Sequence, residues 1–335
     1  MKSIAIIGAG SWGTALGIIA GRAGHRVRLW SRNADVVGEI NRERLNSKYL
    51  SSHVIPESVS ATCEMGEALR EAEFVLLASP SHVTRELVVR MLPSLEPQMI
   101  FISATKGIEI ETGKRVSQVV RDVLNNRFEP RFVCLSGPSF AGEVAAGQPT
   151  AVVAASTSIR YSHLIQAELS FQNLRIYTNT DVVGTELGGS VKNVMAVAAG
   201  MVAGLGLGTN SVAALITRGL AEIARLALAE GARMETLMGL AGMGDLVLTC
   251  TGALSRNRYV GQELGKGRPL PEILSGMNEV AEGVKTTRAV QRLAQRLGVE
   301  MPVTNEVNAV LYEGKSAAAA AEALMTRPLR GEFER

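Results

Sequence analysis

The stretch from Ser3 to Leu16 limits the possible folds of this chain more than any other part. Its four apolar residues from Ile4 to Ile7 are typical of a short buried parallel strand. Gly8-x-Gly10-x-x-Gly13 and an apolar segment of helical length follow at once. In such a strand–turn–helix unit the three glycines permit a tight turn, a close approach of a pyrophosphate, and close packing of helix on strand. Because helix N-termini attract phosphate, the stretch predicts a dinucleotide-binding unit; the alternative is a turn with a structural role alone.

The end of the second expected strand, His25 to Trp30, indicates which dinucleotide is bound. An acidic residue at this place binds the ribose 2′-hydroxyl of NAD, whereas an arginine accommodates the 2′-phosphate of NADP. The strand is followed by Ser31-Arg32-Asn33 and by no acid. We therefore expect NADP(H) to be accepted, with Arg32 at the 2′-phosphate. The alternative is a solvated surface arginine.

The first half of the chain alternates short β-rich runs with helical segments. Expected strands include Phe74–Ala78, Met99–Ser103, Phe132–Leu135, Thr150–Ala154 and Leu174–Thr178. This alternation predicts an α/β fold with a doubly wound, mostly parallel, Rossmann-like sheet. Ligands of such sheets lie beyond the carboxyl ends of the strands. That rule directs attention to three segments that follow strands: 79–82, 105–107 and 137–141.

From about Asp181 the β-branched runs give way to Ala, Leu, Met and Gly at helical spacing. We expect a dinucleotide-binding domain over 1–188 and an all-helical domain over 189–335, with the active site between them. The uncharged stretch 193–217 approaches the roughly 20 apolar residues that a membrane helix needs. Glycines at 204, 206 and 208 interrupt it, so we expect two buried helices and no stable membrane insertion.

Composition excludes several other functions. A formal net charge of +3, without runs of Lys and Arg, does not indicate nucleic-acid binding. Cys63, Cys134 and Cys250 are odd in number and far apart, which suits neither a disulfide framework nor a zinc site and favours a reducing cytoplasm. The four histidines show no metal-binding spacing, so we expect no metal.

Lys192 is the candidate proton donor. An enzyme that adds a hydride to a ketone needs a donor beside the carbonyl oxygen, because an alkoxide develops there. Lys192 is the only charged residue between Glu186 and Arg218. Burial on such an apolar helix lowers a lysine pKa and brings it closer to neutral pH. The alternative is a lysine whose stem reaches along the protein surface to solvent.

Three further sites carry groups that suit this chemistry. Lys106 directly follows a strand, so it could reach the nicotinamide end and depress the pKa of Lys192; the alternative is a lysine of a surface loop. Asp245, in a glycine-flanked turn, is either a partner of Lys192 or a structural turn residue. The run Ser255-Arg256-Asn257 offers hydroxyl, guanidinium and amide groups that can hold a phosphate. Its alternative is a helix cap followed by an exposed arginine.

These motifs also occur in a fixed order along the chain. From about Ser3 to Gly331 the sequence closely resembles the bacterial NAD(P)-dependent sn-glycerol-3-phosphate dehydrogenase family. The resemblance is carried by Gly8–Ala15, Ala104–Gly107, Ser136–Ala141, Glu186 through Asn193, Ala241–Asp245, Ser255–Asn257 and Asn278–Gly283.

This resemblance implies the reversible reduction of dihydroxyacetone phosphate to sn-glycerol 3-phosphate for glycerophospholipid synthesis, with NADP(H) or NAD(H), in a cytoplasmic homodimer. It implies that Lys192 is the proton acceptor in the oxidation direction, with Lys106 and Asp245 beside it. The implied substrate contacts are Lys106, Gly137, Ser139, Lys192, Asp245, Ser255, Arg256 and Asn257. The implied cofactor contacts, with the motif glycines, are Gly8, Gly10, Ser11, Trp12, Gly13, Arg32, Lys106, Ala141, Arg256, Val280 and Glu282. Asn33 stands where the family often has a basic residue, which leaves the strength of the NADP preference open.

Two other functions remain as alternatives. A related dehydrogenase of β-hydroxy acids or of a ketopantoate-like substrate would share the cofactor domain and a lysine but need no phosphate anchor. Activity unaffected by Arg256→Ala would favour it. A non-catalytic NADP(H)-binding regulator would bind the cofactor without turnover.

Overall fold

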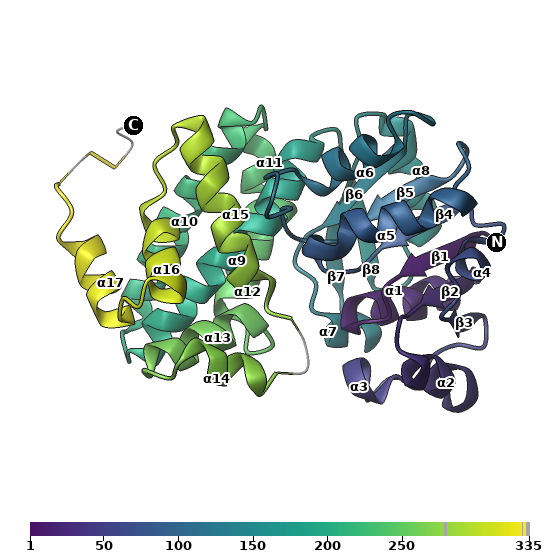
Figure 1. Cartoon of the computed structure of the whole chain (residues 1–335), viewed down its shortest axis with the longest axis horizontal. Helices are drawn as coiled ribbons and strands as arrows, with labels where there is room; N and C mark the ends of the chain where they lie inside the picture. Colours follow the sequence, from purple (N-terminus) through teal and green to yellow (C-terminus); the bar gives the residue numbers. More distant parts are fainter. Residues whose placement is uncertain (278–279, 330, 333–335) are drawn as a thin grey trace.

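The computed structural model describes residues 1–277, 280–329 and 331–332. Figure 1 shows a sheet covered by helices on one side of the molecule and a group of helices on the other. The expected fold class, a mostly parallel Rossmann-like sheet followed by a helical domain, is confirmed.

One sheet of eight strands forms the first part of the chain. In spatial order the strands are β3 (Val59–Thr62), β2 (Arg26–Trp30), β1 (Ser3–Ile7), β4 (Phe74–Leu77), β5 (Ile100–Ser103), β6 (Arg131–Ser136), β7 (Thr150–Ala155) and β8 (Leu174–Asn179). All neighbouring strands are parallel except β6 and β7, which are antiparallel. The carboxyl ends of β1, β4, β5 and β6 therefore share one edge of the sheet.

Both faces of the sheet are covered, which explains why its central strands are apolar throughout. Side chains of a strand alternate between faces. Ile4 and Ile6 of β1 accordingly face one core, and Ala5 and Ile7 face the other. The first core contains α1 (Ser11–Arg22), α2 (Ala34–Glu43), α3 (Ser47–Leu50), α7 (Ala141–Ala145) and α8 (Ile159–Leu169). The second contains α4 (Met65–Leu69), α5 (Thr84–Met91) and α6 (Val116–Leu124). Short 3₁₀ turns span Ser81–Val83 and Leu92–Ser94.

The rest of the described chain is helical. Its elements are α9 (Val182–Gly204), α10 (Thr209–Ala229), α11 (Met234–Met238), a π-helical turn (Leu240–Gly244), α12 (Asp245–Thr251), α13 (Arg256–Gly265), α14 (Leu270–Ser275), α15 (Glu282–Leu297), α16 (Pro302–Tyr312) and α17 (Ala317–Met325). The composition change at Asp181 coincides with the start of α9, where the Asp181 carboxylate accepts a hydrogen bond from Gly184 N at 2.8 Å. The expected domain boundary, between residues 188 and 189, falls inside this helix.

Helix α9 is the central element of the helical part. It packs against α10, α12, α13 and α15, and nearly all of its residues from Val182 to Met201 are buried. By length and composition it could cross a membrane, but 83% of its most apolar stretch is buried inside the protein. The uncharged stretch 193–217 is divided between α9 and α10, as its glycines indicate. The part within α9 is buried as far as Met201, whereas residues 202–217 are half-buried or exposed. The expectation of two buried helices is therefore wrong for the second one, because the first turns of α10 lie at the surface and this helix is buried only from Gly219 on.

The contact between α9 and α13 is made at backbone level through four glycines. A Cβ added at Gly200 would lie 2.0 Å from the carbonyl oxygen of Arg258, and one at Gly261 would lie 1.9 Å from that of Val197. Gly204 and Gly265 repeat the pattern one turn later. Any side chain at these positions would push the two helices apart.

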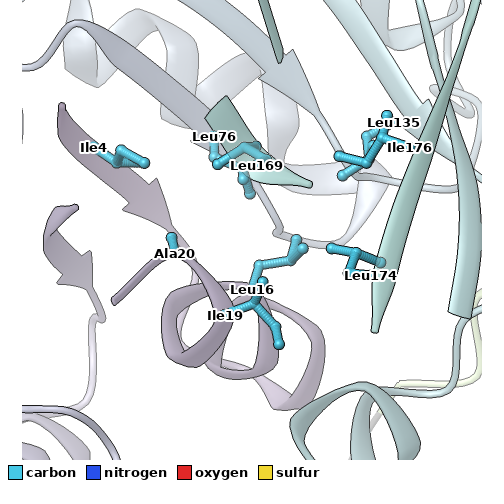
Figure 2. Close-up of a pocket in the computed structure, with 9 residues that line it drawn as sticks. All are labelled: Ile4, Leu16, Ile19, Ala20, Leu76, Leu135, Leu169, Leu174 and Ile176. Atoms are coloured by element: carbon cyan, nitrogen blue, oxygen red, sulfur yellow. The ribbon is translucent and has the colours of Figure 1, made fainter. Parts of the chain in front are cut away.

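Figure 2 shows an apolar cavity inside the first domain. Its nine lining residues are aliphatic and come from β1, α1, β4, β6, α8 and β8. None of the candidate site residues lines it, so this cavity is a feature of core packing.

Candidate active site

The turn between β1 and α1 has the shape that a bound pyrophosphate requires. Gly8 has a φ of 120°, and a Cβ there would lie 2.8 Å from Ala78 O. A Cβ at Gly13 would lie 1.9 Å from Gly8 O, whereas the space above Gly10 is open. Each glycine of the motif thus meets the need predicted for it.

The N-terminus of α1 leaves donors for an anion. Its N-cap is Gly10, which supplies no side-chain cap, and its first turn, which begins with Ser11, holds no acidic residue. The indole Nε1 of Trp12, close to this end, is buried and has no hydrogen-bond partner in the described chain. Orphaned N–H groups at a helix N-terminus favour a phosphate. The residues present therefore fit a dinucleotide.

Arg32 lies where the 2′-phosphate rule places it. It directly follows β2, is exposed, and has no ion-pair partner among the described residues. The neighbouring Asn33 is the N-cap of α2, and its side chain accepts hydrogen bonds from the backbone N–H groups of Asp35 and Val36. Asn33 therefore has a structural task, which leaves Arg32 as the cation at this strand end.

Two lysines from different parts of the chain share one buried carboxylate. Lys192 Nζ, on α9, lies 2.8 Å from Asp245 Oδ1. Lys106 Nζ, in the loop after β5, lies 2.7 Å from Asp245 Oδ2 and 2.9 Å from Gly137 O. Asp245 begins α12 and is only 1% exposed. The structure thus contains the predicted Lys192–Asp245 pair, and the alternative of a lysine that reaches solvent is wrong.

The environment of Lys192 lowers its pKa toward neutral pH. Its pKa is lowered to about 8, chiefly by burial; Asp245 opposes this effect, and Lys106 adds to it through charge repulsion. The Lys106 effect agrees with the sequence-based expectation. An ammonium with such a pKa can give up and regain a proton near neutral pH.

Thr249 is a member of this cluster that the sequence analysis missed. Lys192 Nζ donates to Thr249 Oγ1 at 2.6 Å, and that hydroxyl donates to Asp245 O at 2.6 Å. Thr249 lies four residues after Asp245 on α12. Residues four apart share a helix face, so this spacing was the available signal.

Ser255, Arg256 and Asn257 form the N-terminus of α13. Ser255 is its N-cap and accepts a hydrogen bond from Arg258 N at 3.2 Å. Arg256 is exposed at the first helical position. The helix-cap alternative is therefore present in the structure, and the N–H groups and positive dipole of the same helix end favour an anion.

Asn257 differs from the expectation of a side-chain amide directed at phosphate. Its Nδ2 donates to Asn193 Oδ1 at 3.0 Å, and its Oδ1 accepts from Gly283 N at 2.9 Å. Asn193 in turn donates to Lys106 O at 3.2 Å. The amide links α13 to α9 and α15, so a phosphate at this position would meet the backbone N–H of Asn257 rather than its side chain.

Gly137, Ser139 and Ala141 lie beyond β6. Gly137 has a φ of 137°, and a Cβ there would lie 2.9 Å from the Cα of Val152, so glycine is required. Ser139 Oγ donates to Gly137 O at 3.1 Å, and Ala141 is the first residue of α7. Because Gly137 O also accepts from Lys106, this segment adjoins the lysine pair.

Glu282, on α15 of the helical domain, contacts the cofactor domain. Its Oε2 accepts a hydrogen bond from Ser81 Oγ at 2.9 Å, across 201 residues of sequence. Burial raises the pKa of Glu282, and the Ser81 hydrogen bond opposes that rise. Val280, just before α15, is 41% exposed. Asn278 and Glu279, which belong to the same motif, lie outside the described residues.

Comparison with known proteins decides the family. The family model described as "NAD-dependent glycerol-3-phosphate dehydrogenase N-terminus" matches residues 3–162. The model described as "NAD-dependent glycerol-3-phosphate dehydrogenase C-terminus" matches residues 181–322. The chain belongs to the NAD-dependent glycerol-3-phosphate dehydrogenase family. This membership confirms the resemblance drawn from the motifs and decides against the ketopantoate-type family.

Individual members of the glycerol-3-phosphate dehydrogenase family match along the whole chain. The glycerol-3-phosphate dehydrogenase [NAD(P)+] of Koribacter versatilis is 54% identical over 330 residues, 98% of each chain. That of Geobacter sulfurreducens is 50% identical over 331 residues, 99% of each chain. The crystal structure of the Coxiella burnetii enzyme is 41% identical and superposes with a TM-score of 0.93, covering 97% of this chain and 99% of that one.

Proposed function

We propose that this protein catalyses the reversible reduction of dihydroxyacetone phosphate to sn-glycerol 3-phosphate with NADPH or NADH. The observation that carries the proposal is the buried Lys106–Asp245–Lys192 cluster. It lies beside the carboxyl ends of β5 and β6 and is linked through Asn193 to the N-terminus of α13. A proton donor, a second cation and an anion-binding helix end are thus joined in one site.

The cofactor supplies the hydride to the central carbon of the substrate when it is bound. Lys192 gives a proton to the carbonyl oxygen on which negative charge develops. Asp245 holds both ammonium groups, and Thr249 accepts a hydrogen bond from Lys192, so the donor keeps one orientation. In the oxidation direction the neutral amine of Lys192 removes the hydroxyl proton.

The substrate phosphate is held at the N-terminus of α13. The Arg256 guanidinium, the Ser255 hydroxyl and the backbone N–H of Asn257 supply the donors. Gly137 and Ser139 border the reacting end beside Lys106. The pyrophosphate of the cofactor would be held at Gly8–Gly13 with Ser11 and Trp12, and a 2′-phosphate would be held at Arg32. Lys106, Ala141, Arg256, Val280 and Glu282 would complete the cofactor contacts.

The experiment that tests this function compares substrates in one assay. NADPH oxidation is measured with dihydroxyacetone phosphate, with unphosphorylated dihydroxyacetone and with ketopantoate. We expect turnover with the phosphorylated ketone alone, and Arg256→Ala should raise its KM. Turnover with ketopantoate that is unaffected by Arg256→Ala would support the dehydrogenase alternative, and NADPH binding without any turnover would support a regulator.

The setting in which the enzyme works is part of the proposal. All three cysteines, Cys63, Cys134 and Cys250, are free thiols, which suits the cytoplasm. The apolar helix α9 is buried in the core of the helical domain, which favours a protein without membrane insertion. A homodimer is expected from the family resemblance, and light scattering of the purified chain measures it. Supply of glycerophospholipid synthesis follows from the product.

A further inference from the structure

Glu186 is a buried carboxylate to which the mechanism above gives no task. It lies on α9, six residues before Lys192, and is 6% exposed. Burying a carboxylate is costly unless it is paired and hydrogen-bonded. Its partners therefore show what this part of α9 is built to hold.

Among the described residues, the hydrogen-bond partners of the Glu186 carboxylate belong to the start of α6. Its carboxylate accepts hydrogen bonds from Ser117 N at 2.7 Å and Ser117 Oγ at 2.6 Å, and from Arg115 Nη1 at 2.8 Å. Arg115 is the N-cap of α6, and Ser117 N is one of the donors that a helix N-terminus leaves unpaired. An anion at this end is also favoured by the helix dipole. Glu186 thus ties α9 to the end of the loop that carries Lys106.

The same face of α9 holds the beginning of that loop. Asn193 lies seven residues after Glu186, which is about two turns and returns to the same side of the helix. Its Nδ2 donates to Lys106 O at 3.2 Å. Gly189 lies between them, and a Cβ there would lie 2.5 Å from Ser136 Oγ and 3.8 Å from Lys106 Cγ. Helix α9 therefore holds both ends of the loop from 106 to 115 and approaches its lysine closely in between.

From this geometry we infer that Glu186 is a positioning residue, which fixes the loop of Lys106 against α9 and thereby sets the placement of Lys106 relative to Lys192. Without this tie the hydrogen bonds that the described part of α9 makes to the loop are reduced to that of Asn193, beside the apolar packing of Ile108, and the Lys106 ammonium can move away from the Lys192–Asp245 pair. Displacements of about 1 Å in an active site can lower turnover by about 10²-fold. The inference rests on the proposed role of Lys192.

The charges around both groups decide what a pH profile can report. Lys192 faces Asp245 and Cys250 on α12 and Lys106 on the loop. Glu186 faces Arg115 on α6 and Cys134 on β6. Because Lys106 lowers the pKa of Lys192, release of the loop should raise it. Loss of the Glu186 negative charge alone would lower the pKa of Lys192. The direction of the pKa change therefore separates release of the loop from loss of the charge.

The test uses two variants at the tie and one matched control. Ser117→Ala removes one donor without changing any charge, and Glu186→Gln removes the ion pair with Arg115. Glu230→Gln is the control, because Glu230 Oε2 lies 3.6 Å from Arg115 Nε yet makes no link between α9 and α6. Measured quantities are kcat, KM for dihydroxyacetone phosphate, Kd for NADPH, the isotope effect with 4-deuterated NADPH, and the midpoint of the pH profile.

We expect Glu186→Gln to lower kcat by about 10²-fold and Ser117→Ala by about 10-fold, with the Kd for NADPH unchanged. The isotope effect should rise, and the Ser117→Ala midpoint should move to higher pH. Glu230→Gln should stay within about 2-fold of the unaltered enzyme. If Glu186→Gln does not fold, Ser117→Ala decides alone.

The inference is overturned if Ser117→Ala keeps the kcat, isotope effect and pH midpoint of the unaltered enzyme, or if Glu230→Gln loses as much turnover as Glu186→Gln. Its failure is separable from failure of the proposed function. An inactive Lys192→Met beside fully active variants at Glu186 and Ser117 contradicts only the positioning role. An active Lys192→Met contradicts the mechanism itself.

Discussion

Lys192 can be removed without leaving an unpaired buried charge, because Asp245 keeps its ion pair with Lys106. We therefore expect Lys192→Met to fold and to lose about 10²- to 10⁴-fold in kcat, the usual contribution of general acid–base catalysis. NADPH affinity should be unchanged, since Lys192 bonds to Asp245 and Thr249 and not to the glycine turn. Stopped-flow turnover and fluorescence titration measure the two quantities. Turnover close to that of the unaltered enzyme would place the proton donor elsewhere.

The pKa of about 8 gives the two reaction directions opposite pH dependences. Below this pH Lys192 is an ammonium and can donate, so ketone reduction should be fastest there and fall as the pH rises through 8. Above it the amine can accept a proton, so oxidation of glycerol 3-phosphate should rise over the same interval. Initial rates in both directions between pH 6 and pH 10 test this, and parallel profiles would contradict it.

Arg32 is exposed at the carboxyl end of β2, so its removal should hardly alter stability. Hydrogen bonds to a charged group contribute about 1.5–3 kcal/mol, so Arg32→Ala should weaken NADPH binding by roughly 10- to 100-fold. NADH has no 2′-phosphate and should bind as before. Arg26, exposed at the other end of the same strand, supplies the control variant Arg26→Ala. Equal losses for NADPH and NADH would remove Arg32 from the phosphate site.

At the scale of elements, the glycine contact between α9 and α13 leaves no room for a substitution. Gly261→Ala would place a methyl group 1.9 Å from Val197 O, and the helices must separate. Overpacking of this kind costs about 1–3 kcal/mol, so the free energy of unfolding should fall by that amount. The KM for dihydroxyacetone phosphate should rise as well, because the N-terminus of α13 moves with the helix. Urea unfolding and steady-state kinetics provide the measurements.

Gly276→Ala is the matched control for that variant. Gly276 follows α14 with a φ of −84°, and the nearest atom to an added Cβ lies 3.7 Å away. Its stability should change by less than about 0.5 kcal/mol. Equal effects of the two substitutions would show that the α9–α13 contact has no special role.

Local rules predict those elements whose form is decided within a few residues. The turn of Gly8 to Gly13 was predictable because residues close by in the motif set the requirement for each glycine. The segments at Lys106 and Gly137 were predictable because the carboxyl ends of parallel strands lie at one edge of the sheet. Strand β3, Val59–Thr62, was not expected, since four small residues show no apolar run. Its pairing with β2 decides its conformation.

The parts of the site that escaped prediction depend on which elements pack together. Nothing near Ser81 in the sequence indicates that Glu282, 201 residues away, will accept its hydrogen bond. Likewise the amide of Asn257 has the right chemistry for a phosphate, but packing against α9 and α15 occupies it. Residue type predicts what a side chain can do, and tertiary contacts decide which partner it meets.

At the scale of the whole molecule, ion pairs and hydrogen bonds join the sheet to the helical part. Lys106–Asp245, Arg115–Glu186 and Ser81–Glu282 all cross between them. Since the proposed cofactor site includes residues of both parts, NADPH should stabilise them together. At 100 times its Kd a ligand adds about 2.7 kcal/mol, which corresponds to roughly 4 °C for a chain of this size.

Calorimetry with and without NADPH measures this effect. We expect one transition that moves as a whole, and a smaller shift with NADH at equal concentration. Two transitions of which only one responds would show that the cofactor contacts a single domain.

The backbone contact of α9 and α13 also bears on which substrates the enzyme can process. In the proposed mechanism one helix carries the proton donor and the other presents its amino end to the anion, and at their four glycines no side chain separates them. The backbone contact of the two helices therefore sets the distance between the carbonyl and phosphate positions of the site, and close packing of the interior keeps that distance constant. Accepting a longer phosphorylated ketone would require a new helix spacing, and trimming individual side chains around the ligand would not provide it.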